Sequence, residues 1–266
     1  MNSIERFSNS EFEERLNEAL SVLLCDKRIT PVENQSAVLL GGQSGAGKST
    51  LHVIYKKKYE HNIVVINGDE YRKLHPRFAR IQEQYGIDAP AHTAAWAGAM
   101  VEALVDALSS ERYNLIIEGT LRTSSVPLKT AALLQERGYR VSLALMAVKP
   151  EISLISCQIR YELMRIAGTT PRAVDPAHHG KIVEDIVENL AELETSELIE
   201  DVSLYNRAGT CLVAAKCPAP DAPASLVLKD VLFGAWTEEE RSHYEDLKKQ
   251  LEDARSNSGA GERPAR

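Results

Sequence analysis

Apolar runs alternate with longer amphipathic segments through the middle of the chain. Four runs are short and rich in leucine or β-branched residues, as is typical of buried strands, at residues 37–40, 63–66, 113–118 and 141–148. Segments suited to helices follow them, at residues 50–59, 91–110, 127–137 and 151–166. The second of these helices has the clearest apolar stripe, formed by Trp96, Met100, Leu104 and Leu108. Strands that alternate with helices predict a mostly parallel sheet with right-handed crossovers.

An amphipathic helix is predicted ahead of this core. Over residues 11–24 the apolar positions recur at helical spacing, at Phe12, Leu16, Leu20 and Leu23. Ser10, with Glu13 three residues later, is typical of a capping box at its start. We expect this helix to act as a lid, to pack on the core, or to dock a partner.

The pattern after residue 180 predicts further elements. Residues 181–200 predict an acidic helix, and two strands around a turn follow it, at 202–205 and 210–214. Thr237 with Glu240 predicts a capping box for a last helix over residues 238–254. The expected divisions are an N-terminal helical segment at 1–36, a core domain at 37–236, a C-terminal helix at 237–255 and a disordered tail at 256–266.

A glycine-rich sequence joins the first strand of the core to its first helix. Residues 42–49 fit the pattern Gly, four residues, Gly, Lys, Ser or Thr, in which backbone N–H groups point at phosphate oxygens. Lys48 would reach the β- and γ-phosphates, and the Ser49 hydroxyl would ligate Mg²⁺. The residues expected to bind the nucleoside triphosphate are Gly42, Gln43, Ser44, Gly45, Ala46, Gly47, Lys48, Ser49 and Thr50. We therefore expect an α/β protein of the P-loop NTPase or kinase fold, with a mostly parallel central sheet flanked by helices and helical additions at both ends.

Polar side chains follow the second and third strands. Asp69 comes just beyond residues 63–66, and Glu118, Thr120 and Arg122 follow the third strand. Ligands of open α/β sheets lie at the carboxyl ends of the strands, so an acidic residue there could take a proton from a substrate hydroxyl. Two other interpretations stay open, namely that Asp69 caps the next helix and that the second group forms only caps and a turn.

Two arginines flank a flexible turn after the fourth helix of the core. Arg160 lies before Gly168 and Arg172 lies after it, so a mobile segment could place guanidinium groups on a transferring phosphoryl group. Surface ion pairs with nearby acids are the alternative for both arginines. Glu102, on the helix at 91–110, is expected on periodicity alone to be a solvated residue.

Composition and charge exclude several classes of protein. The formal net charge is −7, from 31 basic and 38 acidic residues, which argues against a nucleic-acid-coating surface. No apolar run approaches the ~18 residues of a membrane span, and the first 18 residues lack the apolar core of a secretory signal. The four cysteines have no metal-site spacing and are expected to be free thiols of a cytoplasmic protein. The pair His178 and His179 lacks a third ligand at metal spacing.

The ordered set of motifs resembles the zeta toxins of bacterial toxin–antitoxin systems. The motifs are Gly-Gly-Gln-Ser-Gly-Ala-Gly-Lys-Ser at 41–49, Asn-Gly-Asp-Glu-Tyr-Arg at 67–72, Glu-Gly-Thr-Leu-Arg at 118–122, Ile-Arg-Tyr-Glu at 159–162 and Leu-Phe-Gly-Ala-Trp at 232–236. The resemblance covers most of the chain, from about Val38 to Trp236. The phosphate loop alone is generic, whereas the run at 118–122 and the order of the set are specific. One departure is Gly180, which stands where family members often carry an acidic residue, so we assign no role to the preceding histidines.

The resemblance implies an activity and roles for matching positions. Zeta toxins are ATP-dependent kinases that phosphorylate a hydroxyl of UDP-N-acetylglucosamine and thereby block cell-wall precursor synthesis. By this resemblance Asp69 would be the catalytic base, and Arg160 and Arg172 would stabilise the phosphoryl group in transfer. The residues that would bind the UDP-sugar are Glu102, Glu118, Thr120 and Arg122.

The resemblance also implies a partner and leaves other functions open. Zeta toxins are held inactive by a separate antitoxin whose helix covers the ATP site, and residues 11–24 are a candidate part of the docking surface. No nucleic acid or membrane partner is expected. Two alternatives remain, namely a phosphotransferase for another nucleotide or UDP-sugar, and a regulatory ATPase switch.

Overall fold

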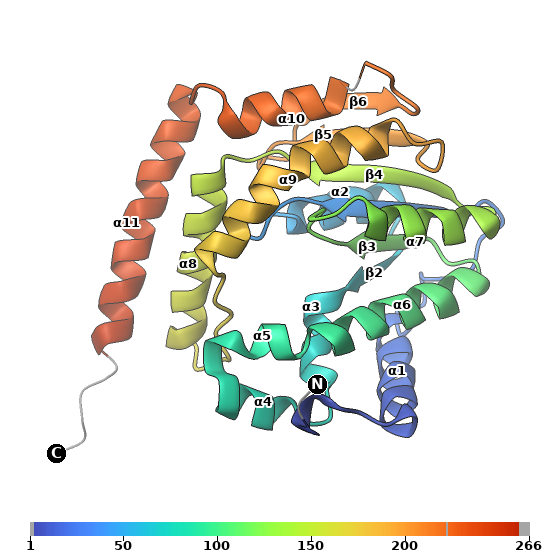
Figure 1. The fold of residues 1–266 in the computed structure, drawn as a ribbon, viewed down its shortest axis with the longest axis horizontal. Coiled ribbons are helices and arrows are strands. Elements are labelled where there is room, and N and C mark those ends of the chain that lie inside the picture. Colours follow the sequence, from blue (N-terminus) through green and yellow to red (C-terminus); the bar gives the residue numbers. More distant parts are fainter. Residues whose placement is uncertain (1–2, 222, 261–266) are drawn as a thin grey trace.

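A six-stranded sheet forms the centre of the protein, for which we used a computed structural model (Figure 1). The structure describes residues 3–221 and 223–260. The strands are β1 Ser36–Gly41, β2 Val64–Asn67, β3 Leu115–Glu118, β4 Arg140–Met146, β5 Asp201–Tyr205 and β6 Cys211–Lys216. Their order is β2-β3-β1-β4-β5-β6, and neighbours are parallel except for the antiparallel pair β5 and β6. The predicted α/β class with a mostly parallel sheet is confirmed.

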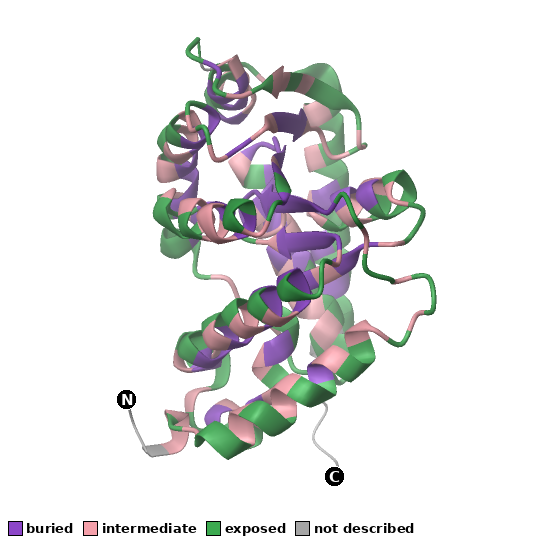
Figure 2. Cartoon of the chain, turned by 90° about the vertical axis from the view of Figure 1, so that its right-hand side faces the viewer, coloured by how far each residue is buried: buried purple, intermediate pink, exposed green. Residues whose placement is uncertain are grey.

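Helices cover both faces of this sheet. The helices are α1 Asn9–Leu23, α2 Ser49–Lys58, α3 Gly68–Tyr71, α4 Phe78–Tyr85, α5 Ala89–His92, α6 Ala94–Ser110, α7 Ser125–Glu136, α8 Pro150–Ile166, α9 Pro176–Glu194, α10 Pro223–Phe233 and α11 Glu238–Ala260. Side chains of β1 alternate between two buried clusters, as the pleat of a strand requires. Ala37 and Leu39 pack with α6, α7, α9 and α10, whereas Val38 and Leu40 pack with α2, α8 and α11. Figure 2 shows the buried sheet between these two layers.

The predicted stripe of α6 is fully buried and organises the N-terminal part of the molecule. Trp96, Met100, Leu104 and Leu108 are each at most 1% exposed. Helix α1 packs on α6, but it begins earlier than predicted, since the capping box is Ser8 with Glu11 and not Ser10 with Glu13. The physical reason is the residue before the cap, because the Phe7 ring stacks on Phe12, as in a hydrophobic staple, and packs edge-on to Trp96.

Helix α9 differs from its predicted bounds at both ends. It begins at Pro176 and not at Lys181, because the Asp175 side chain accepts a hydrogen bond from the Ala177 amide and caps the first turn. It ends at Glu194 and not at Glu200, which leaves residues 195–200 as the connection to β5.

The helix α10 was not predicted, and the end of the chain departs from expectation. The buried carboxylate of Glu194 accepts hydrogen bonds from the amides of Ala224 and Ser225, so this cap comes from 30 residues away. Helix α11 starts with the predicted box of Thr237 and Glu240. It continues to Ala260, so the predicted disorder is wrong for residues 256–260, and residues 261–266 lie outside the described part.

Two further expectations concern the membrane and the cysteines. None of the helices within the described residues is both long and apolar enough to cross a membrane. Cys25, Cys157, Cys211 and Cys217 all carry free thiols, as predicted from their spacing.

Candidate active site

The phosphate loop lies at the carboxyl end of β1, where the chain turns into α2. Gly45 has a φ of 80°, and a Cβ atom there would overlap the Ser153 carbonyl oxygen and lie 2.7 Å from Cys157 Sγ. Only glycine fits both this backbone conformation and this contact with α8. The Lys48 ammonium donates hydrogen bonds back to the carbonyl oxygens of Gly42, at 2.8 Å, and Gln43, at 3.3 Å. The loop thus has the strand, turn and helix order that a phosphate site requires.

A carboxylate from the neighbouring strand faces Lys48. Glu118 ends β3, which pairs with β1, and its Oε1 lies 3.9 Å from Lys48 Nζ. Burial lowers the pKa of Lys48, and the negative charges of Glu118 and Asp69 oppose this shift. The Nε2 atom of His52 lies 2.8 Å from the other Glu118 oxygen. His52 was not predicted to belong to the site, although its position four residues after Lys48 places both on the same face of α2.

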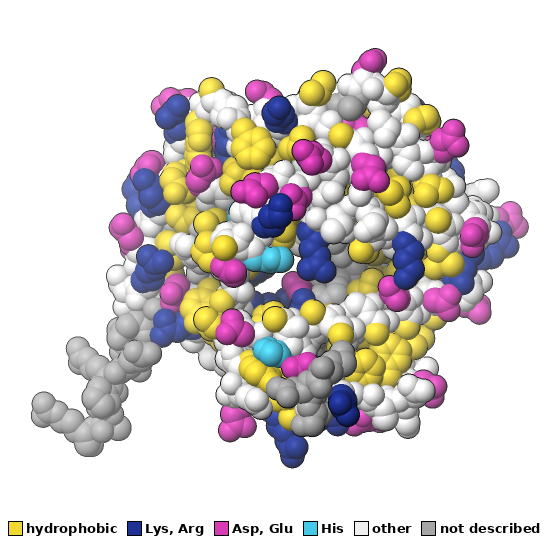
Figure 3. All heavy atoms as spheres, in the orientation of Figure 1, with side chains coloured by type: hydrophobic (Ala, Val, Ile, Leu, Met, Phe, Trp, Pro, Cys, Tyr) yellow, Lys and Arg dark blue, Asp and Glu magenta, His cyan; other side chains and the backbone are white. Residues whose placement is uncertain are grey.

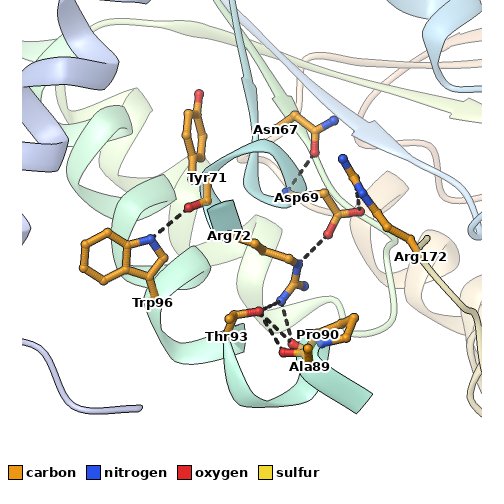
Figure 4. Close-up of polar contacts among 9 residues, drawn as sticks. All are labelled: Asn67, Asp69, Tyr71, Arg72, Ala89, Pro90, Thr93, Trp96 and Arg172. Carbon is orange, nitrogen blue, oxygen red and sulfur yellow. Dashed lines mark hydrogen bonds and ion pairs between the residues drawn. The ribbon is translucent and has the colours of Figure 1, made fainter. Parts of the chain in front are cut away.

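Asp69 follows β2 at the start of α3, and its carboxylate is not used as a helix cap. Asn67 caps this helix, because its Oδ1 accepts a hydrogen bond from the Asp69 amide at 3.1 Å. The Asp69 carboxylate therefore points away and meets two arginines (Figure 4). Arg72 Nε donates to Oδ1 at 2.8 Å, and Arg172 Nη1 lies 3.8 Å from Oδ2. The alternative that Asp69 is a cap is thereby excluded.

Positive charge keeps Asp69 ionised. Burial alone would raise the pKa of this carboxyl, but the hydrogen bond from Arg72 and the charges of Arg72, Arg172 and Arg160 lower it below its usual value. The side chain is still 51% exposed, so a substrate hydroxyl can reach it. This half-open, ionised carboxylate is suited to accept a proton.

Arg72 belongs to this site, although its place in the motif at 67–72 did not by itself predict a role. Its Nη1 donates to the Pro90 carbonyl oxygen at 2.6 Å and to Thr93 Oγ1 at 3.1 Å (Figure 4). The preceding residue is also fixed, because Trp96 Nε1 donates to the Tyr71 carbonyl oxygen at 2.9 Å. Arg72 thus connects the Asp69 carboxylate to the start of α6.

The two predicted arginines come from one helix and the loop that follows it. Arg160 is exposed on α8, and Arg172 lies in residues 167–175, which link α8 to α9. The charge of Arg160 contributes to lowering the pKa of both Lys48 and Asp69. The structure therefore brings Arg160, Arg172 and Asp69 together with the phosphate loop.

The remaining predicted positions are less central. Glu102 is 72% exposed on α6 and forms an ion pair with Lys129 at 3.2 Å, so it faces solvent. Arg122 is exposed and Thr120 is half-buried just after β3. The turn that carries them is held from α9, where Asn189 Nδ2 donates to the Leu121 carbonyl oxygen at 3.0 Å. The sugar-binding role of Glu102, Glu118, Thr120 and Arg122 stays a prediction.

A cavity of about 340 Å³ lies beside the phosphate loop, between α8 and α11. Its lining includes Arg160, Leu163, Met164, Arg207, Leu247 and Gln250. Arg207 bridges this cavity to the loop, since its Nη1 donates to the Gly45 carbonyl oxygen at 3.2 Å and to Ser156 Oγ at 2.8 Å. Arg207 lies in the turn predicted between the strands at 202–205 and 210–214.

One face of the molecule is hollowed. Figure 3 shows a depression in the middle of the molecule, bordered by Lys, Arg, Asp, Glu and His side chains. A loop for phosphate, an ionised carboxylate and at least two guanidinium groups converge at the carboxyl ends of the strands. Such an arrangement can bind a triphosphate and transfer its terminal group to a hydroxyl.

Comparisons with known proteins agree with this geometry. A family model described as "Zeta toxin" matches residues 21–216. The chain is 43% identical to Toxin PezT of Streptococcus pneumoniae serotype 4 over 249 residues, which are 93% of this chain and 97% of that protein. It is 37% identical to Toxin zeta of Streptococcus pyogenes, over 80% of this chain and 74% of that protein.

Solved structures give the same picture. The fold matches a structure from work on the PezAT chromosomal toxin–antitoxin system of Streptococcus pneumoniae, with a TM-score of 0.84, 39% identity and coverage of 96% of this chain and 99% of that one. A structure of AvrRxo1-ORF1:-ORF2 with ATP matches with a TM-score of 0.56 over 94% of this chain and 84% of that one. The identity there is 13%, so this second likeness concerns the fold alone.

Proposed function

The chain belongs to the zeta toxin family, and we propose that it transfers the γ-phosphoryl group of ATP to a hydroxyl of UDP-N-acetylglucosamine. The family is one of kinases, so the chain is a phosphotransferase that uses ATP. The acceptor is the new element of the proposal. Its support is the motif at residues 118–122, which resembles the part of the zeta toxins that binds the sugar nucleotide.

The observation that carries the proposal is the state of Asp69. Its carboxylate is ionised and half-exposed, does not cap a helix, and lies 3.8 Å from Arg172 Nη1. A switch or ATPase needs a residue that positions water, whereas a kinase needs a base that accepts the proton of an organic hydroxyl. An exposed and ionised Asp69 supports the second task.

The phosphates would be held by the loop between β1 and α2. The backbone N–H groups of residues 42–49 and the Lys48 ammonium would bind the β- and γ-phosphates. The Ser49 hydroxyl and the Glu118 carboxylate are the oxygen donors that suit Mg²⁺, which would neutralise the charge that develops on the phosphates. Within residues 3–221 and 223–260 no cluster of three His, Cys, Asp or Glu could bind a metal.

The transfer step uses the base and the arginines. The acceptor oxygen forms a bond to the γ-phosphorus as the bond from this phosphorus to the bridging oxygen breaks, and ADP carries that oxygen away. The hydroxyl proton passes to a carboxylate oxygen of Asp69. Arg160 and Arg172 supply positive charge to the phosphoryl group in transfer.

The purine of ATP would occupy the cavity between α8 and α11. This cavity of about 340 Å³ adjoins the phosphate loop through Arg207, and its wall is apolar at Leu163, Met164 and Leu247. A flat aromatic base can stack on a guanidinium plane and on apolar side chains. Arg207 is the guanidinium group that would stack on the base, because Arg160 on the same wall is assigned to the phosphoryl group.

We also propose that the chain is the toxin of a toxin–antitoxin pair, held inactive by an antitoxin. The predicted docking region, now α1, packs its apolar side on α6, so only its outer side is available to a partner. Its end, at Val22 and Leu23, lines a cavity of about 310 Å³ with His52 and Glu70.

The exposed end of α1 tests this docking region. Val22 is 66% exposed, and we expect Val22→Asp to weaken antitoxin binding in calorimetry. Unchanged affinity would remove α1 from the interface.

A panel of acceptors tests the choice of substrate. The protein would be incubated with γ-labelled ATP and with UDP-N-acetylglucosamine, UDP-N-acetylgalactosamine, UDP-glucose, NAD or no acceptor. We expect label in UDP-N-acetylglucosamine. Label in another acceptor would support the alternative phosphotransferase, and phosphate release that no acceptor stimulates would support a regulatory ATPase.

A further inference from the structure

His179 is a buried residue of a histidine pair that the proposed mechanism does not use. Its neighbour His178 is exposed, whereas His179 is 2% exposed and lies one turn into α9. Its Nε2 lies 2.9 Å from Ser153 Oγ on α8, and the ring also hydrogen-bonds to the backbone of Ser44 in the phosphate loop. The imidazole of α9 therefore contacts two segments that are far from it in the sequence.

The protonation of His179 matches these partners. Burial lowers the pKa of the imidazole, so the neutral ring is favoured at physiological pH. A neutral imidazole has one N–H donor and one acceptor nitrogen. Since Ser153 Oγ donates its proton to the Pro150 carbonyl oxygen, His179 Nε2 carries the ring proton that reaches Ser153.

Ser153 extends the contact to the interior of the phosphate loop. Its side chain is fully buried, and its Oγ lies 2.8 Å from the Pro150 carbonyl oxygen and 3.2 Å from Gln43 Nε2. Gln43, also fully buried, donates from the same nitrogen to the Val148 carbonyl oxygen at 2.8 Å. The second residue of the loop is thus tied to the start of α8, and through Ser153 to His179.

His179 also closes the segment that carries Arg172. Its amide donates to the Asp175 carbonyl oxygen at 2.9 Å, which completes the first turn of α9. Residues 167–175 run from the end of α8 to this turn, and Arg172 lies three residues before Asp175. His179 supplies both the amide that closes this turn and the imidazole that contacts α8. A shift of His179 would therefore move the end of this segment.

We propose that His179 is a positioning residue that joins the phosphate loop to the base of the Arg172 segment, so that the arginine stands at a fixed place relative to the triphosphate. The proposal rests on the proposed phosphoryl transfer but not on the identity of the acceptor. It assigns His179 no contact with substrate. Transfer of this kind depends on placing charge accurately, so a displacement of ~1 Å can cost as much as 10²-fold in rate.

A double-mutant cycle tests this role. His179→Phe keeps the ring and removes both polar contacts, and we expect it to lower kcat by ~10-fold in the wild-type background. In the Arg172→Ala background we expect a loss of less than ~2-fold, because the group to be positioned is already absent. His178→Phe, at the exposed neighbour, is the matched control and should change neither rate. Equal losses in both backgrounds would overturn the proposal.

A second measurement avoids dependence on activity and on folding. Hydrogen exchange of the peptide over residues 167–175 should be faster in His179→Phe than in the wild type and in His178→Phe. His179→Gln, which keeps an amide donor and acceptor, should restore part of both the rate and the protection. If the acceptor proposal fails, this exchange experiment still decides the role of His179, and unchanged exchange with a normal melting temperature would contradict it.

Discussion

At the scale of single residues, the catalytic proposal depends on how one carboxylate is freed and charged. The sequence placed Asp69 after a strand but left open whether it caps a helix or takes a proton. Asn67, two residues earlier, takes the capping hydrogen bond, and Arg72, three residues later, takes a carboxylate oxygen. Both partners lie within three residues of Asp69, so the motif at 67–72 itself contains the residues that decide between the two alternatives.

Arg172 should matter for turnover and not for nucleotide binding. It lies 3.8 Å from Asp69, and its side chain is 43% exposed in the segment between α8 and α9. We expect Arg172→Ala to lower kcat by ~10³-fold and to leave the dissociation constant for ATP nearly unchanged, because the guanidinium group acts on charge that develops in transfer. Steady-state kinetics with equilibrium nucleotide binding would measure both, and an equal loss in both quantities would argue against this role.

Arg72 should set the pH dependence through Asp69. Its hydrogen bond lowers the pKa of this carboxyl, and activity requires the ionised form, so activity falls as the pH drops through that pKa. Removing Arg72 raises the pKa, and the acid limb of kcat/KM in Arg72→Met should move to higher pH. Arg80→Met, at an exposed arginine of α4, is the control. Identical acid limbs in all three proteins would show that Arg72 does not act on the base.

At the scale of elements, strand ends and the phosphate loop were predictable, and caps supplied from a distance were not. Apolar runs and the loop pattern locate β1 to β4 and the site at their carboxyl ends. The sequence around α10 contains prolines and suggests a loop, because the carboxylate that caps this helix belongs to α9. The start of α1 was predicted too late for a similar reason, because the contact of Phe7 with Trp96 is a tertiary contact.

The packing of the phosphate loop on α8 predicts that Gly45 tolerates no side chain. A Cβ atom would overlap the Ser153 carbonyl oxygen, and the φ of 80° is unfavourable for alanine. We expect Gly45→Ala to weaken ATP binding by ~10-fold or more. Gly98→Ala, within α6 and in open space, should instead stabilise the fold by ~0.5–1 kcal/mol. Calorimetry and urea unfolding measure the two effects, and normal ATP affinity in Gly45→Ala would refute the packing argument.

Glu194 should stabilise the fold through α10. Its carboxylate is fully buried and accepts the amides of Ala224 and Ser225, at 3.0 and 2.9 Å. Glu194→Ala leaves buried amides without these acceptors and should lower the free energy of unfolding by about 2 kcal/mol. Glu192→Ala, at an exposed position of the same helix, should have little effect in the same urea titration. Equal stability of both variants would contradict the cap.

At the scale of the whole molecule, the site is assembled from segments that lie far apart in the chain. The parallel sheet brings to one edge several residues that each follow or lie near a predicted element. These residues are Lys48, Asp69, Glu118, Arg160 and Arg172. His52, Arg207 and His179 could not be assigned in this way, because their roles come from contacts between α2, α8, α9 and the turn after β5. The resemblance to a family supplied roles, and the three-dimensional contacts supplied the residues that support them.

The most direct measurement combines the proposed acceptor with the proposed base. Purified protein and its Asp69→Asn variant would be incubated with ATP, Mg²⁺ and UDP-N-acetylglucosamine, and the sugar nucleotide would be analysed by mass spectrometry. We predict that wild type adds the mass of one phosphoryl group, and that the variant binds ATP but gives almost no product. Equal product from both proteins, or none from wild type with ATP bound, would contradict the account.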